Sequence, residues 1–131
     1  MPPKIKDERQ KTYKHKDMVI ILPGLTGNHT EGYNVNIIKE ALDRGLQPVV
    51  VNYRGASEMP LTSPVIYSAG SANDIREPIF YIYKTYCENL RKENNEPISL
   101  FLIGSSLGAN IMANYLGEEG KNCFIKAACC F

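Results

Sequence analysis

Short apolar runs alternate with stretches of helical period along most of this chain. The apolar runs, which predict strands, occupy residues 18–22, 48–51, 98–103 and 124–131. The stretches of helical period occupy residues 33–44, 71–86 and 107–116. Strands that are apolar throughout and alternate with helices are typical of a parallel sheet covered on both faces. We therefore predict an α/β fold with a four-stranded parallel sheet flanked by helices.

Turn and capping signals set the expected limits of the helices. Gly45 supplies a stop for the first helix, and residues 71–74 have the spacing of a capping box at the start of the second. Pro78 lies inside that second helix and should bend it, because proline removes a backbone hydrogen bond. Residues 56–70 contain prolines, and their hydrophobic residues follow neither a helical nor a strand spacing, so they predict a long surface excursion. Residues 91–97 predict a charged connector.

The composition is that of an ordinary globular domain, with 44% hydrophobic and 22% charged residues. The formal net charge is +1, which gives no reason to expect a nucleic acid as partner. Basic residues gather in residues 1–17, which we interpret as a polar leader that precedes a domain at residues 18–131. Because the chain stops inside an apolar run, we expect this domain to be incomplete, as in a truncated gene product or fragment.

The cysteines suggest neither a disulfide framework nor a metal site. They are Cys87, Cys123, Cys129 and Cys130, with no CxxC pair and no histidine at ligand spacing. We therefore expect reduced thiols, no metal and no cofactor. The sequence has no signal peptide and no run of 18 apolar residues that would form a transmembrane segment. These features favour a cytoplasmic protein.

One short motif carries the chemistry. Residues 104–108 read Gly-Ser-Ser-Leu-Gly and match G-x-S-x-G, with an apolar strand before the motif and a helix after it. A tight turn of this kind holds Ser106 in a strained conformation with its hydroxyl exposed, as a nucleophile requires. Gly104 and Gly108 flank it because a Cβ at either place would collide as strand and helix fold back on each other. The plainer alternative is a glycine-containing turn with Ser106 as a helix cap, and we interpret Ser105 as a packing residue.

A glycine-rich loop follows the first predicted strand. Residues 23–27 read Pro-Gly-Leu-Thr-Gly and should lie, like Ser106, at the carboxyl edge of the parallel sheet. The backbone N–H of Leu25 is then a candidate donor to an oxyanion, beside the N–H of Leu107 at the start of the following helix. The alternative is an ordinary turn between a strand and a helix.

Seven motifs in a fixed order give the chain a specific resemblance. They read LPGLTG (22–27), NYRG (52–55), PLTSP (60–64), YSAG (67–70), NDIR (73–76), GSSLGAN (104–110) and NYLGEEG (114–120). Together they resemble the YheT-like, embryogenesis-associated abhydrolase family, which includes medium-chain fatty acid ethyl ester synthase/esterases. The resemblance implies the N-terminal half of an α/β-hydrolase domain. It also implies a serine esterase or lipase that hydrolyses carboxylic esters, acylglycerol and phospholipid esters among them, and sometimes transfers the acyl group to an alcohol.

The resemblance also assigns roles to individual residues. Ser106 matches the family's nucleophile, and Leu25 and Leu107 match its oxyanion donors. The family's strand order and right-handed crossovers predict that residues 48–53 form an edge strand. Residues 18–22, 98–103 and 124–131 then follow in that order. The expected partner is a small-molecule or lipid ester substrate, through which the parent protein would reach a membrane surface.

The family's catalytic acid and histidine lie beyond the strand at which this chain stops. In this fold both follow the serine, so His15, His29 and Asp74, which precede Ser106, do not match them. We interpret His29 as solvated and Asp74 as a first-turn carboxylate favoured by the helix dipole. We expect ester hydrolysis from the parent protein and little from the chain alone. The alternative is a non-catalytic, degenerate fragment that binds acyl ligands or a partner.

Overall fold

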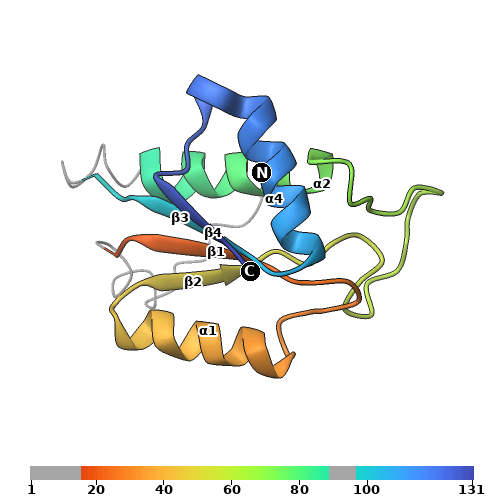
Figure 1. Cartoon of the computed structure of the whole chain (residues 1–131), viewed down its shortest axis with the longest axis horizontal. Helices are drawn as coiled ribbons and strands as arrows, with labels where there is room; N and C mark the ends of the chain where they lie inside the picture. Colours follow the sequence, from red (N-terminus) through yellow and green to blue (C-terminus); the bar gives the residue numbers. More distant parts are fainter. Residues whose placement is uncertain (1–15, 89–96) are drawn as a thin grey trace, which may run out of the picture.

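The computed structural model describes residues 16–88 and 97–131 and contains a parallel sheet. Its strands are β1 (Met18–Leu22), β2 (Gln47–Val50), β3 (Leu100–Gly104) and β4 (Ala127–Cys130). They lie in the order β2-β1-β3-β4, and every neighbouring pair is parallel (Figure 1). The predicted parallel sheet and its strand order are therefore confirmed.

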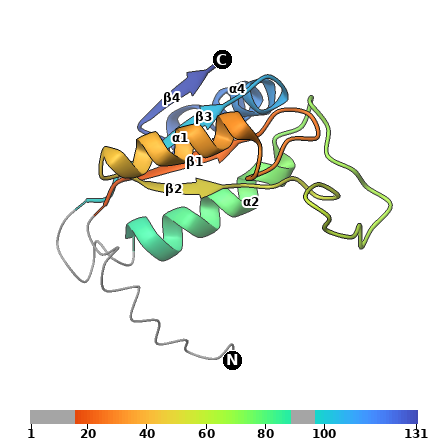
Figure 2. The ribbon, with the colours of Figure 1, turned by 90° about the horizontal axis from the view of Figure 1, so that it is seen from below.

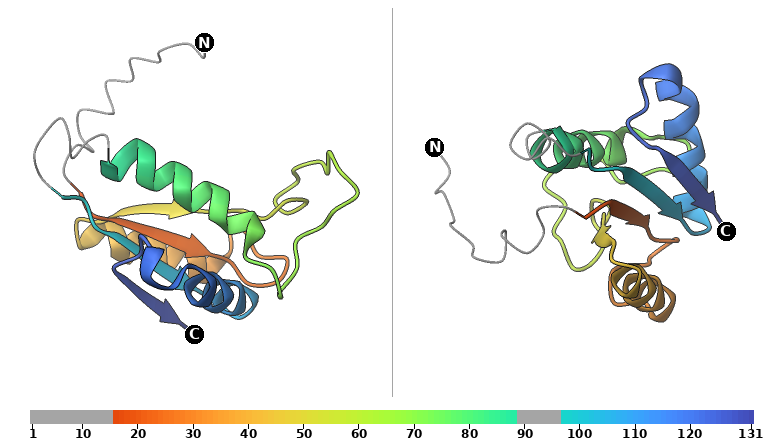
Figure 3. Two further views of the ribbon diagram at one scale, coloured as in Figure 1. Left: turned by 90° about the horizontal axis from the view of Figure 1, so that it is seen from above. Right: turned by 90° about the vertical axis from the view of Figure 1, so that its left-hand side faces the viewer.

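Helices cover the sheet on both sides. The helix α1 (Gly32–Asp43) covers one face, and α2 (Asn73–Ile82) and α4 (Leu107–Glu119) cover the other (Figures 1 and 3). The central strand β1 is buried along its whole length, as predicted for a strand covered on both faces. Complete burial of one such aliphatic side chain stabilises the fold by about 1.5–3 kcal/mol. None of the helices in the described ranges is long and apolar enough to cross a membrane.

The larger core lies between the sheet and the pair α2 and α4. Side chains alternate along a strand, and the alternate residues Met18, Ile20 and Leu22 of β1 belong to this core. From the helices it contains Ile75, Ile79 and Ile82 of α2 and Ile111, Met112 and Tyr115 of α4. The helix that follows the predicted nucleophile is thus anchored by its own apolar face.

The two edge strands are covered to different degrees. The strand β2 is half-buried and carries Pro48, whose missing N–H is tolerated in an edge strand. The strand β4 is exposed throughout, and among the described strands it pairs with β3 alone. Cys129 and Cys130 are therefore exposed, and all four cysteines are free, as expected.

The helix limits differ in part from those predicted. Gly45 follows α1 with a φ of 77°, the left-handed conformation expected of a helix stop. The helix α4 runs past the predicted end at residue 116 and stops only at Gly120, which also has a positive φ. After α2 the chain continues as a π-helical segment at Tyr83–Glu88, so the α-helical part ends earlier than its apolar period suggests.

The predicted capping box at residues 71–74 is wrong. The helix α2 begins at Asn73, and its N-cap residue is Ala72, which makes no side-chain cap hydrogen bond. The Ser71 hydroxyl accepts from the N–H only two residues along (N to Oγ 3.3 Å). The Asp74 carboxylate, which should complete the box, binds the guanidinium of Arg54 instead. An oppositely charged partner therefore takes the carboxylate that the box requires.

Residues 51–72 form no helix or strand, which confirms the long surface excursion predicted at residues 56–70. The excursion extends beyond the carboxyl ends of the strands (Figure 2). The charged connector at 91–97 lies outside the described residues except for Pro97, and the polar leader lies outside them except for Lys16 and Asp17. Asp17 joins two strands, because its carboxylate accepts from the Ser99 N–H at 2.7 Å and its carbonyl from the Gln47 N–H at 2.8 Å.

Candidate active site

Ser106 lies in the turn between β3 and α4. Its backbone has φ 50° and ψ −112°, a conformation that residues other than glycine rarely adopt. Ser106 is exposed, and its N–H donates to the Phe131 carbonyl at 2.8 Å. The strained and exposed turn expected from the motif is therefore present.

Close backbone packing requires both glycines of the motif. A Cβ on Gly104 would lie 2.7 Å from the Gly108 carbonyl oxygen and 2.8 Å from the Cα of Ala109. A Cβ on Gly108 would lie 2.2 Å from the carbonyl oxygen of Leu22 and 2.6 Å from that of Pro23. Gly104 therefore meets the following helix, as predicted. The predicted partner of Gly108 is wrong, because its Cβ would meet the end of β1, against which α4 packs as well as against its own strand β3.

The loop at residues 23–27 packs against the turn that holds Ser106. A Cβ built on Gly24 would lie 3.6 Å from the Ser106 Cβ, which is ordinary van der Waals contact. The Gly27 N–H donates to the Gly24 carbonyl at 3.0 Å and closes a tight turn, on which the Leu25 side chain is exposed. The loop and Ser106 thus meet at the carboxyl edge of the sheet.

Two backbone amides beside Ser106 are the candidate oxyanion donors. Leu107 is the first residue of α4, so its N–H has no acceptor within the helix and lies at the positive end of the helix dipole. Leu25 directly follows Gly24, which lies beside Ser106. We predict that both amides lie within about 3.5 Å of the Ser106 hydroxyl. Their role as oxyanion donors also stays a prediction.

Two tyrosines that sequence reasoning missed hold this loop. The Tyr53 hydroxyl donates to the Pro23 carbonyl at 2.9 Å, and the Gly24 N–H donates to the Tyr33 hydroxyl at 3.0 Å. Tyr53 is 1% exposed, and burial raises its pKa well above the usual range, so it stays a neutral donor. The apolar period and the strand pattern of the sequence carry no signal for either contact, because both depend on tertiary placement.

A cavity of about 340 Å³ lies beside the excursion and is not lined by Ser106. Its lining consists of Arg54, Pro60, Leu61, Thr62, Ser63 and Asp74. The Arg54 Nε donates to the Asp74 carboxylate at 2.6 Å, so the two charges of the cavity neutralise each other. Asp74 lies in the first turn of α2, as predicted.

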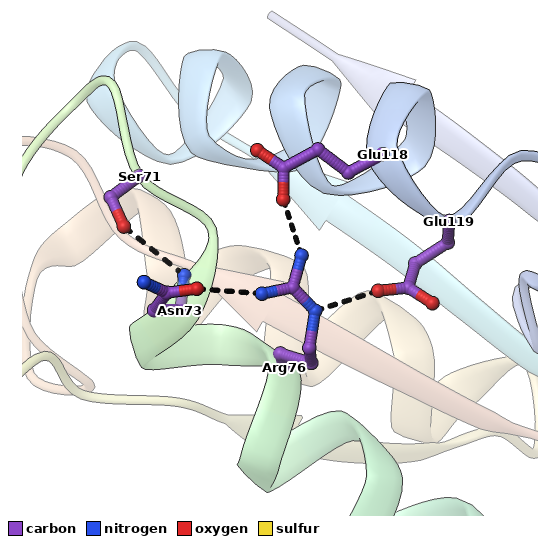
Figure 4. A network of polar contacts seen from close by, with 5 residues as sticks. All are labelled: Ser71, Asn73, Arg76, Glu118 and Glu119. Atoms are coloured by element: carbon purple, nitrogen blue, oxygen red, sulfur yellow. Dashed lines mark hydrogen bonds and ion pairs between the residues drawn. The ribbon is translucent and has the colours of Figure 1, made fainter.

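A polar network ties α2 to the far end of α4 (Figure 4). The Arg76 guanidinium donates to Glu119 and to Asn73, both at 2.7 Å, and pairs with Glu118. The hydrogen bonds to Glu119 and Glu118 raise the pKa of Arg76. The helix dipole disfavours carboxylates at a carboxyl end, and the guanidinium offsets this. The network therefore holds the helix that begins after Ser106 against its neighbour.

The same helix also binds the end of the excursion. The side-chain amides of Asn110 and Asn114, one turn apart on α4, both donate to the Ala69 carbonyl, at 2.7 and 3.0 Å. These contacts fix the excursion beside the first turns after Ser106.

Of the two histidines named above, the structure describes His29. His29 is exposed in the loop after Gly27, as expected for a solvated side chain. His15 lies outside the described residues.

Comparison with solved structures gives the class of fold. Mouse alpha/beta hydrolase domain-containing protein 10 matches with a TM-score of 0.58 and 16% identity, over 86% of this chain and 39% of that protein. At this identity the likeness shows the fold alone. The predicted α/β-hydrolase fold is confirmed.

Comparison with curated sequences gives the relatives, although no family model matches the chain. The chain is 33% identical over 111 residues to embryogenesis-associated protein EMB8 of Picea glauca. It is 38% identical over 114 residues to monoacylglycerol lipase of Saccharomyces cerevisiae. These matches cover 85% and 86% of this chain but 22% and 23% of the relatives, so the chain spans about a quarter of their length. The predicted resemblance is confirmed, because relatives named embryogenesis-associated protein and monoacylglycerol lipase match over about 85% of this chain.

Proposed function

We propose that the whole protein containing this chain is a serine hydrolase of carboxylic esters. Ser106 is the nucleophile, and the N–H groups of Leu25 and Leu107 are the oxyanion donors. The observation that carries the proposal is an exposed serine at φ 50°, between β3 and α4 and in contact with the loop at 23–27. Such a conformation costs on the order of 1–3 kcal/mol, and the close packing of the flanking glycines maintains it.

The proposed reaction passes through an acyl-enzyme. The Ser106 oxygen attacks the ester carbonyl carbon while a histidine takes its proton, and the new oxyanion faces the two amides. The intermediate then expels the alcohol, which receives that proton. Water then loses a proton to the same histidine and attacks the acyl carbonyl carbon, and the Ser106 oxygen leaves with that proton as the carboxylic acid is released. Because the acid and histidine of this fold follow the serine, we propose that residues after Phe131 supply them.

We propose a lipid or medium-chain acyl ester as the substrate. The name of one relative, monoacylglycerol lipase, supports this class. The same acyl-enzyme serves hydrolysis and transfer to another alcohol, so the acceptor depends on what reaches the site.

The excursion supports contact with a lipid surface, which we propose takes place in the cytoplasm. Met59, Leu61, Val65 and Ile66 are between 45% and 62% exposed, and no charged residue occurs between positions 59 and 72. Exposed apolar side chains that gather in one segment mark membrane or partner surfaces. This segment projects from the sheet end that carries Ser106, so contact with a membrane brings lipid esters toward that end.

Replacing both Val65 and Ile66 with serine should weaken binding to phosphatidylcholine vesicles by about tenfold or more, since full burial of one such side chain is worth about 1.5–3 kcal/mol and only the exposed part of each, 54% and 62%, is left to bury. Co-sedimentation of the whole protein measures the change. Leu42→Ser is the matched control, because Leu42 is 49% exposed on α1, away from the excursion. Equal binding by wild type and the double variant contradicts the proposed lipid contact.

A fluorophosphonate probe should label the whole protein on Ser106, because the probe reacts with activated serine nucleophiles. Ser106→Ala should lose the label, and Ser105→Ala, which changes the neighbouring serine of the same turn, should keep it. Peptide mapping locates the adduct. Labelling that persists in Ser106→Ala contradicts Ser106 as the nucleophile, whereas a protein that is never labelled favours the non-catalytic alternative.

A further inference from the structure

A single peptide group in the loop beside Ser106 is bonded at both of its polar ends by tyrosine hydroxyls. This group joins Pro23 to Gly24. Its carbonyl accepts from the Tyr53 hydroxyl at 2.9 Å, and its N–H donates to the Tyr33 hydroxyl at 3.0 Å. Tyr53 follows β2 and Tyr33 lies in the first turn of α1, so the peptide is held from two separate elements.

These contacts determine where the next amide points. A peptide group is planar, so hydrogen bonds at both ends fix the plane between Pro23 and Gly24. The following plane is fixed by the Gly24 carbonyl, which accepts from the Gly27 N–H at 3.0 Å. In a trans peptide the Leu25 N–H points opposite to that carbonyl, and the described residues contain no cis peptide. The Leu25 N–H is therefore directed out of the turn.

Gly24 itself has wide conformational freedom, so the loop needs these external contacts. Tyr33 provides the contact that lies beside Ser106. A Cβ built on Gly24 would touch both the Tyr33 hydroxyl, at 3.4 Å, and the Ser106 Cβ, at 3.6 Å. On the other side of the hydroxyl, a Cβ on Gly27 would lie only 2.7 Å from it. The Tyr33 oxygen thus fits into a space that Gly24 and Gly27 leave open.

We propose that Tyr33 is a positioning residue of the site: its hydroxyl holds the Gly24 N–H and thereby aims the Leu25 amide at the oxyanion. The proposal rests on the proposed function, since it assigns a task to an amide of that site. Tyr33 is 37% exposed, whereas Tyr53 is fully buried and also belongs to the large core. Tyr33 can therefore be changed with less effect on the fold.

Tyr33→Phe should lower kcat for a medium-chain ester by about tenfold, less than the loss of a whole oxyanion donor. The KM and the melting temperature should stay near those of the wild type, because substrate contacts and the core are unchanged. Tyr81→Phe is the matched control: it removes a hydroxyl from a 61% exposed tyrosine on α2 and should leave kcat unchanged. Gly27→Ala should also lower kcat, because its Cβ would lie 2.7 Å from the Tyr33 hydroxyl and 3.1 Å from the Gly24 carbonyl oxygen and so disturbs both contacts that fix the loop.

Two measurements separate this inference from the proposed function. If Ser106→Ala abolishes hydrolysis and Tyr33→Phe retains the wild-type kcat, the positioning role is overturned and the proposed function stands. If Ser106→Ala leaves hydrolysis unchanged, both are overturned. Amide hydrogen exchange of Gly24 provides a readout without activity, and Tyr33→Phe should accelerate it by about tenfold, as expected when a protecting hydrogen bond is lost. Unchanged exchange at Gly24 contradicts the contact on which the inference depends.

Discussion

Gly108→Ala should destabilise the fold by about 3 kcal/mol or more, the range of severe overpacking. The added carbon would lie 2.2 Å from the Leu22 carbonyl oxygen and 2.6 Å from that of Pro23. Both neighbours are backbone atoms, so α4 would have to move away from the end of β1 to relieve the contact. Urea unfolding followed by circular dichroism measures the loss.

Gly117→Ala is the matched control on the same helix. A Cβ on Gly117 meets nothing within 4 Å, so the change replaces a poor helix former with the best one and should stabilise by about 0.5–1 kcal/mol. Opposite signs for the two substitutions are the expected result. If the Gly108→Ala variant is as stable as the wild type, α4 does not pack against the end of β1 as closely as the structure shows.

Ser106→Ala should lower kcat/KM of the whole protein for a medium-chain ester by about 10³-fold or more, as for loss of the nucleophile in triad enzymes. Oxyanion stabilisation leaves some rate, so uncatalysed hydrolysis is the reference. The melting temperature should change little, because Ser106 is exposed and its side chain contributes nothing to the core.

The 131-residue chain by itself should behave like this variant. The histidine that its structure describes, His29, is exposed in a loop that precedes Ser106 in a fold whose base follows it. Turnover by the isolated chain that depends on Ser106 contradicts this interpretation and requires another base.

The sequence predicts the sheet well because its strands are short, mostly apolar runs. Periodicity alone does not separate such runs from buried helix, but their shortness, their β-branched side chains and the neighbouring glycines and prolines favour strands, and the handedness of crossovers restricts their order. The turn at Ser106 is predictable for a similar reason, since glycines at 104 and 108 and the flanking elements belong to one local pattern.

The rest depends on contacts between distant segments. The capping box at 71–74 is wrong because the N-cap of α2 is Ala72, one residue after Ser71, and the Asp74 carboxylate binds Arg54, far away in the chain. No periodicity indicates that Gly108 meets Leu22. In the same way, Tyr33 appears in the sequence only as a helix residue, although its hydroxyl binds the loop nine residues earlier.

The most direct test of Ser106 as nucleophile is to trap the acyl-enzyme. The whole protein is mixed with a p-nitrophenyl ester of a medium-chain acid, quenched in acid during the first turnover, digested and examined by mass spectrometry. The proposed function predicts one acyl group on the peptide that contains Ser106, located on that residue, and none in Ser106→Ala. An acyl group on a different residue, or turnover of the ester with no acyl group on Ser106 at any quench time, contradicts it.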